Sequence, residues 1–280
     1  MSNAQILVFG NEKGGAGKST VAMHAAVHLL HRGLRVAFID LDLRQRSLAR
    51  FFSNRAAWAA ANDKVLPHAV EPHLADKPAK LLTMPEREAK AAFDRALEEA
   101  LDTADYVVVD TPGGDHALSR RAHAAAHLIV TPMNDSFVDF DLLGEVDPVT
   151  LDVRRPSIYA ETVWNSRKQR AVWDGRSIAW IVLRNRLAAT EARNRKRVDE
   201  KVAALGKRIG FSVLPGLRDR VIYRELFPFG LTVADLSADI KPVALSLSHV
   251  AARQELLALM QALGLEDDTA SCPGSLSACG

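Results

Sequence analysis

A glycine-rich segment near the N-terminus carries the residues best suited to chemistry. It follows an apolar run at 6–9, covers residues 10–20 and reads GNEKGGAGKST. Its glycines allow a tight turn whose N–H groups converge, and the positive end of a following helix adds to their field. The Lys18 ammonium could reach the β- and γ-phosphates of a nucleotide, and the Ser19 hydroxyl could ligate Mg²⁺. The segment therefore predicts a site for a nucleoside triphosphate with its magnesium ion.

The segment departs from the usual phosphate-loop pattern G-x-x-x-x-G-K-[ST] at one position. Glu12 stands where the pattern has glycine, and a second lysine, Lys13, precedes the glycines. The alternative is a glycine-rich turn with incidental lysines, but strand, loop and helix fall in the order that a phosphate loop needs. The residues expected to bind the nucleotide here are Lys13, Gly14, Gly15, Ala16, Gly17, Lys18, Ser19 and Thr20.

Acidic residues end two further apolar runs. Asp40 and Asp42 follow the run at 36–39, and Asp110 follows the run at 106–109 and precedes a flexible Thr-Pro-Gly-Gly stretch. The carboxyl ends of parallel strands meet at one edge of a sheet, where ligands of open α/β folds bind. We expect Ser19, Asp40 and Asp110 to lie near the metal and Asp42 to orient the attacking water. Alternatively, Asp40 and Asp42 cap the next helix.

The elements that would position these residues alternate along the chain. Short apolar runs, most of them rich in β-branched residues, predict strands buried on both faces, and amphipathic stretches between them predict crossover helices. The fold class is therefore α/β, with a mainly parallel twisted sheet flanked by helices on both faces. The expected strands are 6–9, 36–39, 106–109, 127–130, 179–183 and 211–214, and the expected helices include 21–32, 85–101, 193–207 and 243–263.

We find no repeat or linker that divides the chain, so we expect a single P-loop NTPase domain over residues 1–265. Two stretches fit the alternation poorly: 62–84, with three prolines, and 152–178, which is polar and basic. Both are interpreted as surface excursions. Residues 266–280 are expected to form a disordered tail.

The net charge of +2 conceals a strong polarity along the chain. Residues 151–224 hold 18 Lys and Arg against 7 Asp and Glu, whereas the rest hold 18 against 27. A solvated helix face is one explanation of the basic stretch. Binding of DNA through its phosphates, without sequence preference, is the other. The residues expected to contact DNA are Arg193, Arg195, Lys196, Arg197, Arg218 and Arg220.

Cysteine and hydropathy patterns indicate the compartment. Cys272 and Cys279 both lie in the tail, which is typical of a reducing cytoplasm. No uninterrupted apolar run approaches the roughly 18 residues of a membrane span, and the tail does not form a basic amphipathic helix. We therefore expect a cytoplasmic protein without a membrane partner.

Several motifs together resemble a known group of proteins. KGGAGKST at 13–20, DLD at 40–42 and DTP at 110–112 are similar to the ParA/MinD group of deviant Walker ATPases. The segments at 131–140, 183–186, 190–197 and 216–232 closely resemble one family of that group, the MipZ ATPases that position the division plane. The likeness runs from about residue 5 to residue 265, with 62–84 and the tail as exceptions.

The resemblance assigns roles to further residues. It implies that Lys13 contacts the phosphates held by a partner subunit, which makes dimerisation depend on ATP. Asn185 matches the position that contacts the adenine, although it could equally be a turn residue at a strand end. Residues of the loop that closes over the base are Pro215, Leu217 and Asp219. The catalytic set is then Lys13, Lys18 and Asp42, and without an evident arginine finger hydrolysis should be slow.

By the same resemblance, the protein is a homodimerising switch that uses ATP and Mg²⁺. It binds a ParB-like partition protein and non-specific DNA, and it inhibits FtsZ assembly from a nucleoid-associated position graded from the cell poles. An alternative is a ParA-type chromosome or plasmid partition ATPase. A redox P-loop enzyme like the nitrogenase iron protein would need two core cysteines, and none precedes Cys272.

Overall fold

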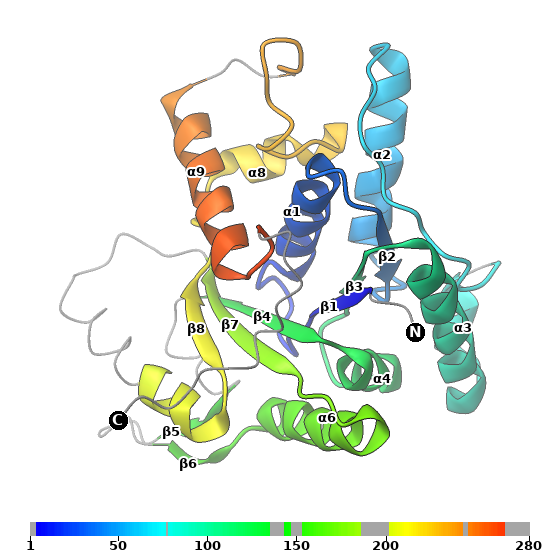
Figure 1. Cartoon of the computed structure of the whole chain (residues 1–280), viewed down its shortest axis with the longest axis vertical. Helices are drawn as coiled ribbons and strands as arrows, with labels where there is room; N and C mark the ends of the chain where they lie inside the picture. Colours follow the sequence, from blue (N-terminus) through cyan, green and yellow to red (C-terminus); the bar gives the residue numbers. More distant parts are fainter. Residues whose placement is uncertain are drawn as a thin grey trace.

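The computed structural model describes residues 4–76, 78–134, 143–146, 153–185, 202–242 and 246–266. Its centre is a six-stranded sheet in the order β2-β3-β1-β4-β7-β8, in which every neighbouring pair is parallel (Figure 1). The predicted α/β class and parallel sheet are confirmed. The strands are β1 (Gln5–Phe9), β2 (Val36–Asp40), β3 (Tyr106–Asp110), β4 (Leu128–Asn134), β7 (Ala179–Asn185) and β8 (Ser212–Pro215).

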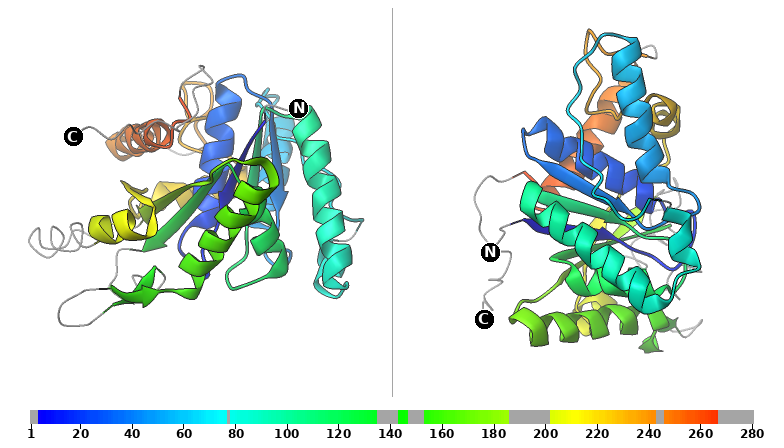
Figure 2. Two further views of the ribbon diagram at one scale, coloured as in Figure 1. Left: turned by 60° about the horizontal axis from the view of Figure 1, so that its bottom comes forward. Right: turned by 90° about the vertical axis from the view of Figure 1, so that its right-hand side faces the viewer.

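Helices cover both faces of this sheet, as Figure 2 shows. Alternating side chains of β1 explain the arrangement: Leu7 and Phe9 pack on one side, and Ile6 and Val8 on the other. The first side carries α1 (Lys18–His31), α2 (Ser47–Ala61), α8 (Val221–Glu225) and α9 (Leu247–Ala262). The second carries α3 (Glu86–Thr103), α4 (Ala117–Ala125) and α6 (Ile158–Asp174).

Shorter elements complete the described part of the chain. β5 (Gly144–Val146) and β6 (Val153–Pro156) pair as an antiparallel ribbon, and η1 (Pro78–Leu82) and η2 (Phe227–Phe229) are 3₁₀ turns. Of the expected helix at 193–207, only its end is described, within a helical segment at 202–209. Residues 267–280 of the expected tail lie outside the described residues. Among the described residues, no helix is both long and apolar enough to cross a bilayer.

The basic stretch at 152–178 is more than the surface excursion that we expected. It contains α6, which begins where the Ser157 hydroxyl accepts the Ala160 N–H and ends at Gly175 in the left-handed conformation. Tyr159 and Val163 on its inner face are buried in the core of the second side. The polar composition misled the interpretation because only one narrow stripe of this helix faces inward.

The stretch at 62–84 runs partly along the outer edge of the sheet. The N–H of Phe38 donates to the Val70 carbonyl at 2.9 Å, and the N–H of Val70 donates to the Val36 carbonyl at 2.9 Å. This bridge places Val70 beside β2 in parallel orientation. The stretch is therefore anchored to the sheet through its backbone.

A buried ion pair holds the loop before α9 against the first helical layer. Both the Arg55 and Asp235 side chains are fully buried, and their charged groups meet at 2.6 Å. The Arg55 guanidinium also donates to the carbonyls of Pro67 and Gly230, and His31 contacts the same Asp235 oxygen at 2.7 Å. Burial alone would raise the pKa of Asp235, but hydrogen bonds from His31 and Arg55 hold it well below its ordinary value.

We predict that Asp235→Ala lowers the free energy of unfolding by about 3 to 5 kcal/mol, because it leaves the Arg55 charge buried without a partner. Urea denaturation at neutral pH measures this loss. The depressed carboxyl pKa means that the stabilisation is present above about pH 4 and is lost as the pH falls further, so the variant and the parent converge in acid. Glu86→Ala, which breaks an exposed pair with Lys90, is the control and should leave the free energy of unfolding nearly unchanged. A loss of similar size in both variants would contradict the prediction.

Candidate nucleotide site

The glycine-rich loop joins β1 to α1 in the geometry of a phosphate loop. Gly15 and Gly17 have φ angles of 73° and 92°, in the left-handed region that side chains disfavour, and Gly17 immediately precedes the helix. A β-carbon at Gly17 would also lie 2.6 Å from the Asn185 amide nitrogen. Lys18 is buried at the start of α1, and its ammonium group donates to the Lys13 carbonyl at 3.1 Å.

The remaining loop residues differ in exposure and in the element that holds them. Gly14 is exposed, Ala16 is buried, and Ser19 and Thr20 belong to the first turn of α1. Below the loop, the Lys13 N–H donates to the Asn11 side-chain oxygen at 2.7 Å, and the Asn11 amide donates to the Pro132 carbonyl. These bonds hold the loop to β4.

The carboxylates meet at the carboxyl edge of the sheet, as expected. Asp40 and Asp110 are direct neighbours in the register of β2 and β3. Asp110 is completely buried; one oxygen accepts the Ser19 hydroxyl at 2.5 Å, and the other is buried without a hydrogen-bond partner. Burial, and then the repulsion from Asp40, raises the pKa of Asp110 to about 8. Burial also raises the pKa of Asp40 to about 6.

These features fit a magnesium ion at Asp110 and Ser19. An unpartnered carboxylate oxygen and an adjacent hydroxyl are the hard oxygen ligands that Mg²⁺ prefers. A cation there would offset the burial and repulsion that disfavour the ionised carboxylates. Lys18 contributes positive charge nearby, although burial lowers the pKa of its ammonium group.

Asp40 and Asp42 show the capping contacts that we left open as an alternative. The Asp40 carboxylate accepts the N–H groups of Leu48 and Ala49 at the start of α2, at 2.9 and 3.0 Å, and its other oxygen accepts the Asp42 N–H. Asp42 is half-buried and accepts the Gln45 N–H at 3.0 Å. A direct metal bond from Asp40 would therefore compete with three backbone donors, which makes Asp110 and Ser19 the better ligand candidates.

Asn185 joins two loops of the site at the end of β7. Its side-chain nitrogen donates to the Ala16 carbonyl at 3.0 Å, and its oxygen accepts the Leu217 N–H at 2.9 Å. The phosphate loop is thereby coupled to the loop after β8. In that second loop Pro215 is exposed, Leu217 is buried, and Asp219 is exposed beside Arg224.

The structure describes only two of the residues that were predicted to contact DNA. Arg193, Arg195, Lys196 and Arg197 lie outside the described residues. Arg218 and Arg220 are described, and both contact the Glu255 carboxylate of α9, at 3.1 and 3.0 Å. Arg218 remains largely exposed, whereas Arg220 is mostly covered.

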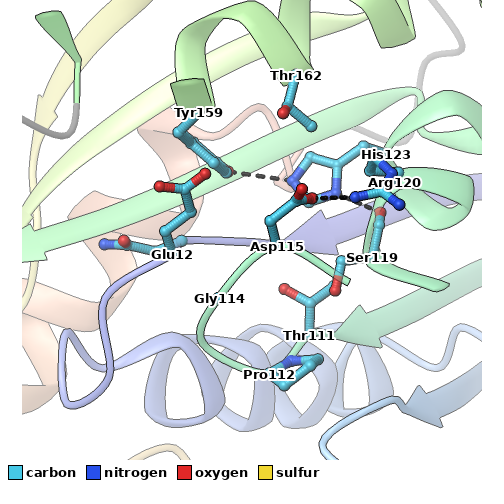
Figure 3. Close-up of a pocket in the computed structure, with 11 residues that line it drawn as sticks. Glu12, Thr111, Pro112, Gly114, Asp115, Ser119, Arg120, His123, Tyr159 and Thr162 are labelled. Atoms are coloured by element: carbon cyan, nitrogen blue, oxygen red, sulfur yellow. Dashed lines mark hydrogen bonds and ion pairs between the residues drawn. The ribbon is translucent and has the colours of Figure 1, made fainter. Parts of the chain in front are cut away.

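A buried network beneath the loop was not expected from any sequence motif. The Tyr159 hydroxyl of α6 donates to the Gly10 carbonyl at 2.8 Å and also contacts the side chains of His123 and Thr131, at 3.1 and 3.0 Å. Figure 3 shows Tyr159 and His123, joined by this hydrogen bond, among the residues that line a small pocket together with Glu12 and Thr111. Only long-range packing brings these residues together, so no local motif could have revealed them.

Comparisons with known proteins agree with this geometry. A family profile described as ATPase MipZ matches residues 5–267. The chain belongs to the MipZ family of ATPases. Among curated relatives, the protein virC1 of Rhizobium radiobacter is 33% identical over 137 residues, which cover 49% of this chain and 52% of that protein. The sporulation initiation inhibitor protein Soj of Bacillus subtilis is 23% identical over 163 residues, or 51% of this chain and 63% of Soj. The chain thus spans only about half the length of the curated relatives that it matches.

Solved structures share the fold of this MipZ-family chain at low sequence identity. An ATP complex of a Cyanothece McdA variant has a TM-score of 0.58 at 16% identity, over 96% of this chain and 100% of that one. The Aquifex aeolicus MinC:MinD cell division protein complex has a TM-score of 0.55 at 14% identity, over 96% and 99%. The predicted ParA/MinD-type fold is confirmed.

The charge arrangement at Asp110 predicts an unusual pH dependence of stability. Because its carboxyl pKa is raised, the native protein retains a proton that the unfolded chain releases, and stability falls as the pH rises from about 4 to 8. Asp110→Asn should flatten this slope and stabilise the protein by about 1 to 2 kcal/mol near pH 8. Urea denaturation near pH 5 and pH 8, without nucleotide or Mg²⁺, measures the effect. Asp102→Asn, at an exposed site, is the control; an unchanged slope in Asp110→Asn would refute the assignment.

Proposed function

We propose that this protein is a Mg²⁺-dependent ATPase that switches between a monomer and an ATP-bound dimer. The observation that carries the proposal is the preorganised phosphate loop of a MipZ-family chain, in which Lys18 and Ser19 face the carboxylate of Asp110. The converging N–H groups and Lys18 bind the phosphates, and Ser19 and Asp110 hold the magnesium ion. Asn185 and the loop at 215–219 contact the base.

Each catalytic residue has a distinct role in this proposal. Lys18 neutralises charge on the transferring phosphoryl group, and Asp42 orients the attacking water. Lys13 reaches the phosphates held by the partner subunit, so that a stable dimer forms only with ATP. The bound Mg²⁺ supplies Lewis-acid stabilisation of the phosphate oxygens. Hydrolysis is slow because the chemistry depends on lysines and one positioned water, with no arginine finger evident in the sequence motifs, and slow turnover suits a timer.

Membership of the MipZ family supports the cellular role that we propose. The dimer binds non-specific DNA and a ParB-like partition protein and inhibits FtsZ assembly, so that division occurs away from the cell poles. This role implies a cytoplasmic protein that associates with the nucleoid in a gradient from the poles. A ParA-type partition ATPase is the alternative, and the fold likeness to a putative plasmid partition protein of Borrelia burgdorferi, with a TM-score of 0.55, is compatible with it.

Substitutions separate nucleotide binding, dimerisation and hydrolysis. Lys18→Ala should weaken ATP binding about 100-fold, since it removes the charge beside the phosphates. Lys13→Ala should bind ATP and remain monomeric, and Asp42→Ala should hydrolyse ATP about 100-fold more slowly and keep the dimer longer. Size-exclusion chromatography with ADP and with ATP reports the dimer, and phosphate release reports turnover. Lys90→Ala on the exposed side of α3 is the control. Normal hydrolysis by Asp42→Ala would overturn its assignment.

The Asp42→Ala dimer also distinguishes the two cellular roles. FtsZ sedimentation with GTP should show less polymer in the pellet when the ATP dimer is added, and no change with the Lys13→Ala monomer. An ATP dimer that leaves FtsZ assembly unchanged would favour the partition alternative.

DNA binding should depend on salt in proportion to the phosphate contacts. Arg193→Ala/Arg195→Ala/Arg197→Ala should reduce the slope of log affinity against log salt by about 3, because each contact releases about one counterion. Arg220→Ala should have a smaller effect, because Glu255 already binds its guanidinium. Fluorescence anisotropy with a labelled duplex measures both. A flat salt dependence, or an unchanged slope in the triple variant, would refute phosphate-based binding.

A further inference from the structure

A groove of about 360 Å³ lies beside α6 and reaches Arg120 of α4. Its lining consists of Arg120 from α4 and of Thr162, Asn165, Ser166, Lys168 and Gln169 from α6. The lining therefore combines two cations with four neutral hydrogen-bonding side chains and, among the described residues, contains no carboxylate. Such a lining favours an anionic ligand with several polar atoms.

Two carboxylates of α3 and α6 are paired with arginines that do not line the groove. Asp94 binds Arg121 at 2.8 Å, and Asp174 binds Arg170 at 2.9 Å. Among the residues that the structure describes, no carboxylate pairs with Lys168, whose ammonium group lies 5.5 Å from the centre of the Trp164 ring. Positive charge in the groove is thus only partly neutralised.

Two large aromatic side chains of α6 are open to solvent, and one of them, Trp164, lies beside the groove cation Lys168. Trp164 is 53% exposed and Trp173 is 65% exposed, although most tryptophans are largely buried. The Arg121 guanidinium lies 5.4 Å from the centre of the Trp173 ring. Tryptophan and arginine are among the residue types that contribute most of the binding energy in protein interfaces.

The groove is also connected to the loop that follows β3. Arg120 and Thr162 line both the groove and the small pocket of Figure 3, and Arg120 binds Asp115 of that loop at 2.5 Å. The same loop donates the Gly114 N–H to the Glu12 carbonyl of the phosphate loop at 2.7 Å. Since the Arg120–Asp115 pair is half-exposed, another carboxylate can replace Asp115 at little cost.

We infer that the α4–α6 groove docks an acidic segment of a partner protein. Carboxylates of the segment bind Arg120 and Lys168, and an apolar side chain packs on Trp164. A peptide fits better than a nucleic acid because the two cations lie among amide and hydroxyl groups that hydrogen-bond peptide backbone, and the Trp164 ring lies beside Lys168. Binding draws Arg120 away from Asp115 and so acts on the loop that contacts Glu12.

A display library of random twelve-residue peptides tests this inference on the full chain. The library is first depleted on the Arg120→Gln/Lys168→Gln variant, which removes peptides that bind outside the groove. Peptides then selected on the parent protein should be enriched in Asp and Glu together with Leu or Phe. The best peptide, labelled with fluorescein, should bind at least about 10-fold more weakly to the double variant and to Trp164→Ala. Lys241→Gln, at an exposed site outside the groove, should bind like the parent.

A gain-of-affinity variant guards against misfolding as an explanation. Asp115→Asn frees Arg120 from its internal partner and should strengthen peptide binding about 2- to 5-fold. Each of four results would overturn the inference. These are enrichment of neutral or basic peptides, no enrichment at all, peptide binding by the groove variants equal to that of the parent, and weaker peptide binding by Asp115→Asn. Duplex DNA is also added as a competitor of the acidic peptide. If the DNA displaces the peptide from the parent but not from Arg193→Ala/Arg195→Ala/Arg197→Ala, the inference is overturned in favour of a nucleic-acid surface. ATP binding is measured in parallel and should persist in the groove variants. Loss of the peptide result alone would therefore leave the proposed ATPase function standing.

Discussion

The placement of Asp110 in a fully buried position beside Asp40 is the constraint on which the site depends. Two carboxylates at adjacent ends of parallel strands repel each other, and burial raises both of their pKa values. The chain tolerates this because Lys18 and the Ser19 hydroxyl lie close to Asp110, and because backbone N–H groups of α2 hold Asp40. A site that is costly without a cation gains stability when one binds, which couples folding free energy to the ligand.

Loops from both halves of the sheet are connected through single side chains. Asn185 forms hydrogen bonds with the phosphate loop and with the loop after β8. Tyr159 of α6, on the second side of the sheet, forms a hydrogen bond with Gly10 at the start of the phosphate loop. Glu255 in turn binds Arg220 and the Tyr223 hydroxyl, so α9 is linked to the loop after β8. Movement of either loop must therefore displace contacts in several elements, and this is the property that a nucleotide-dependent switch needs.

The parallel sheet and the phosphate loop were predictable because each rests on a local signal. Apolar runs mark buried strands, and the spacing of Gly15, Gly17 and Lys18 marks the loop. The roles of Asp40 and Asp42 were ambiguous, since an aspartate after a strand can cap a helix as well as approach a metal. α6 was missed because its polar face dominates the composition of 152–178. Tyr159, His123 and Glu255 could not be found from sequence, as their partners lie 28 or more residues away or in another layer.

The backbone bridge at Val70 has a consequence for assembly. An uncovered outer strand offers its N–H and C=O groups to any other strand, which invites fibre-like growth. Here Val70 occupies part of that row on β2, and Pro67 and Pro72 on either side lack the N–H groups that would continue it. The part of the β2 edge beside Val70 is thus protected against the addition of another strand.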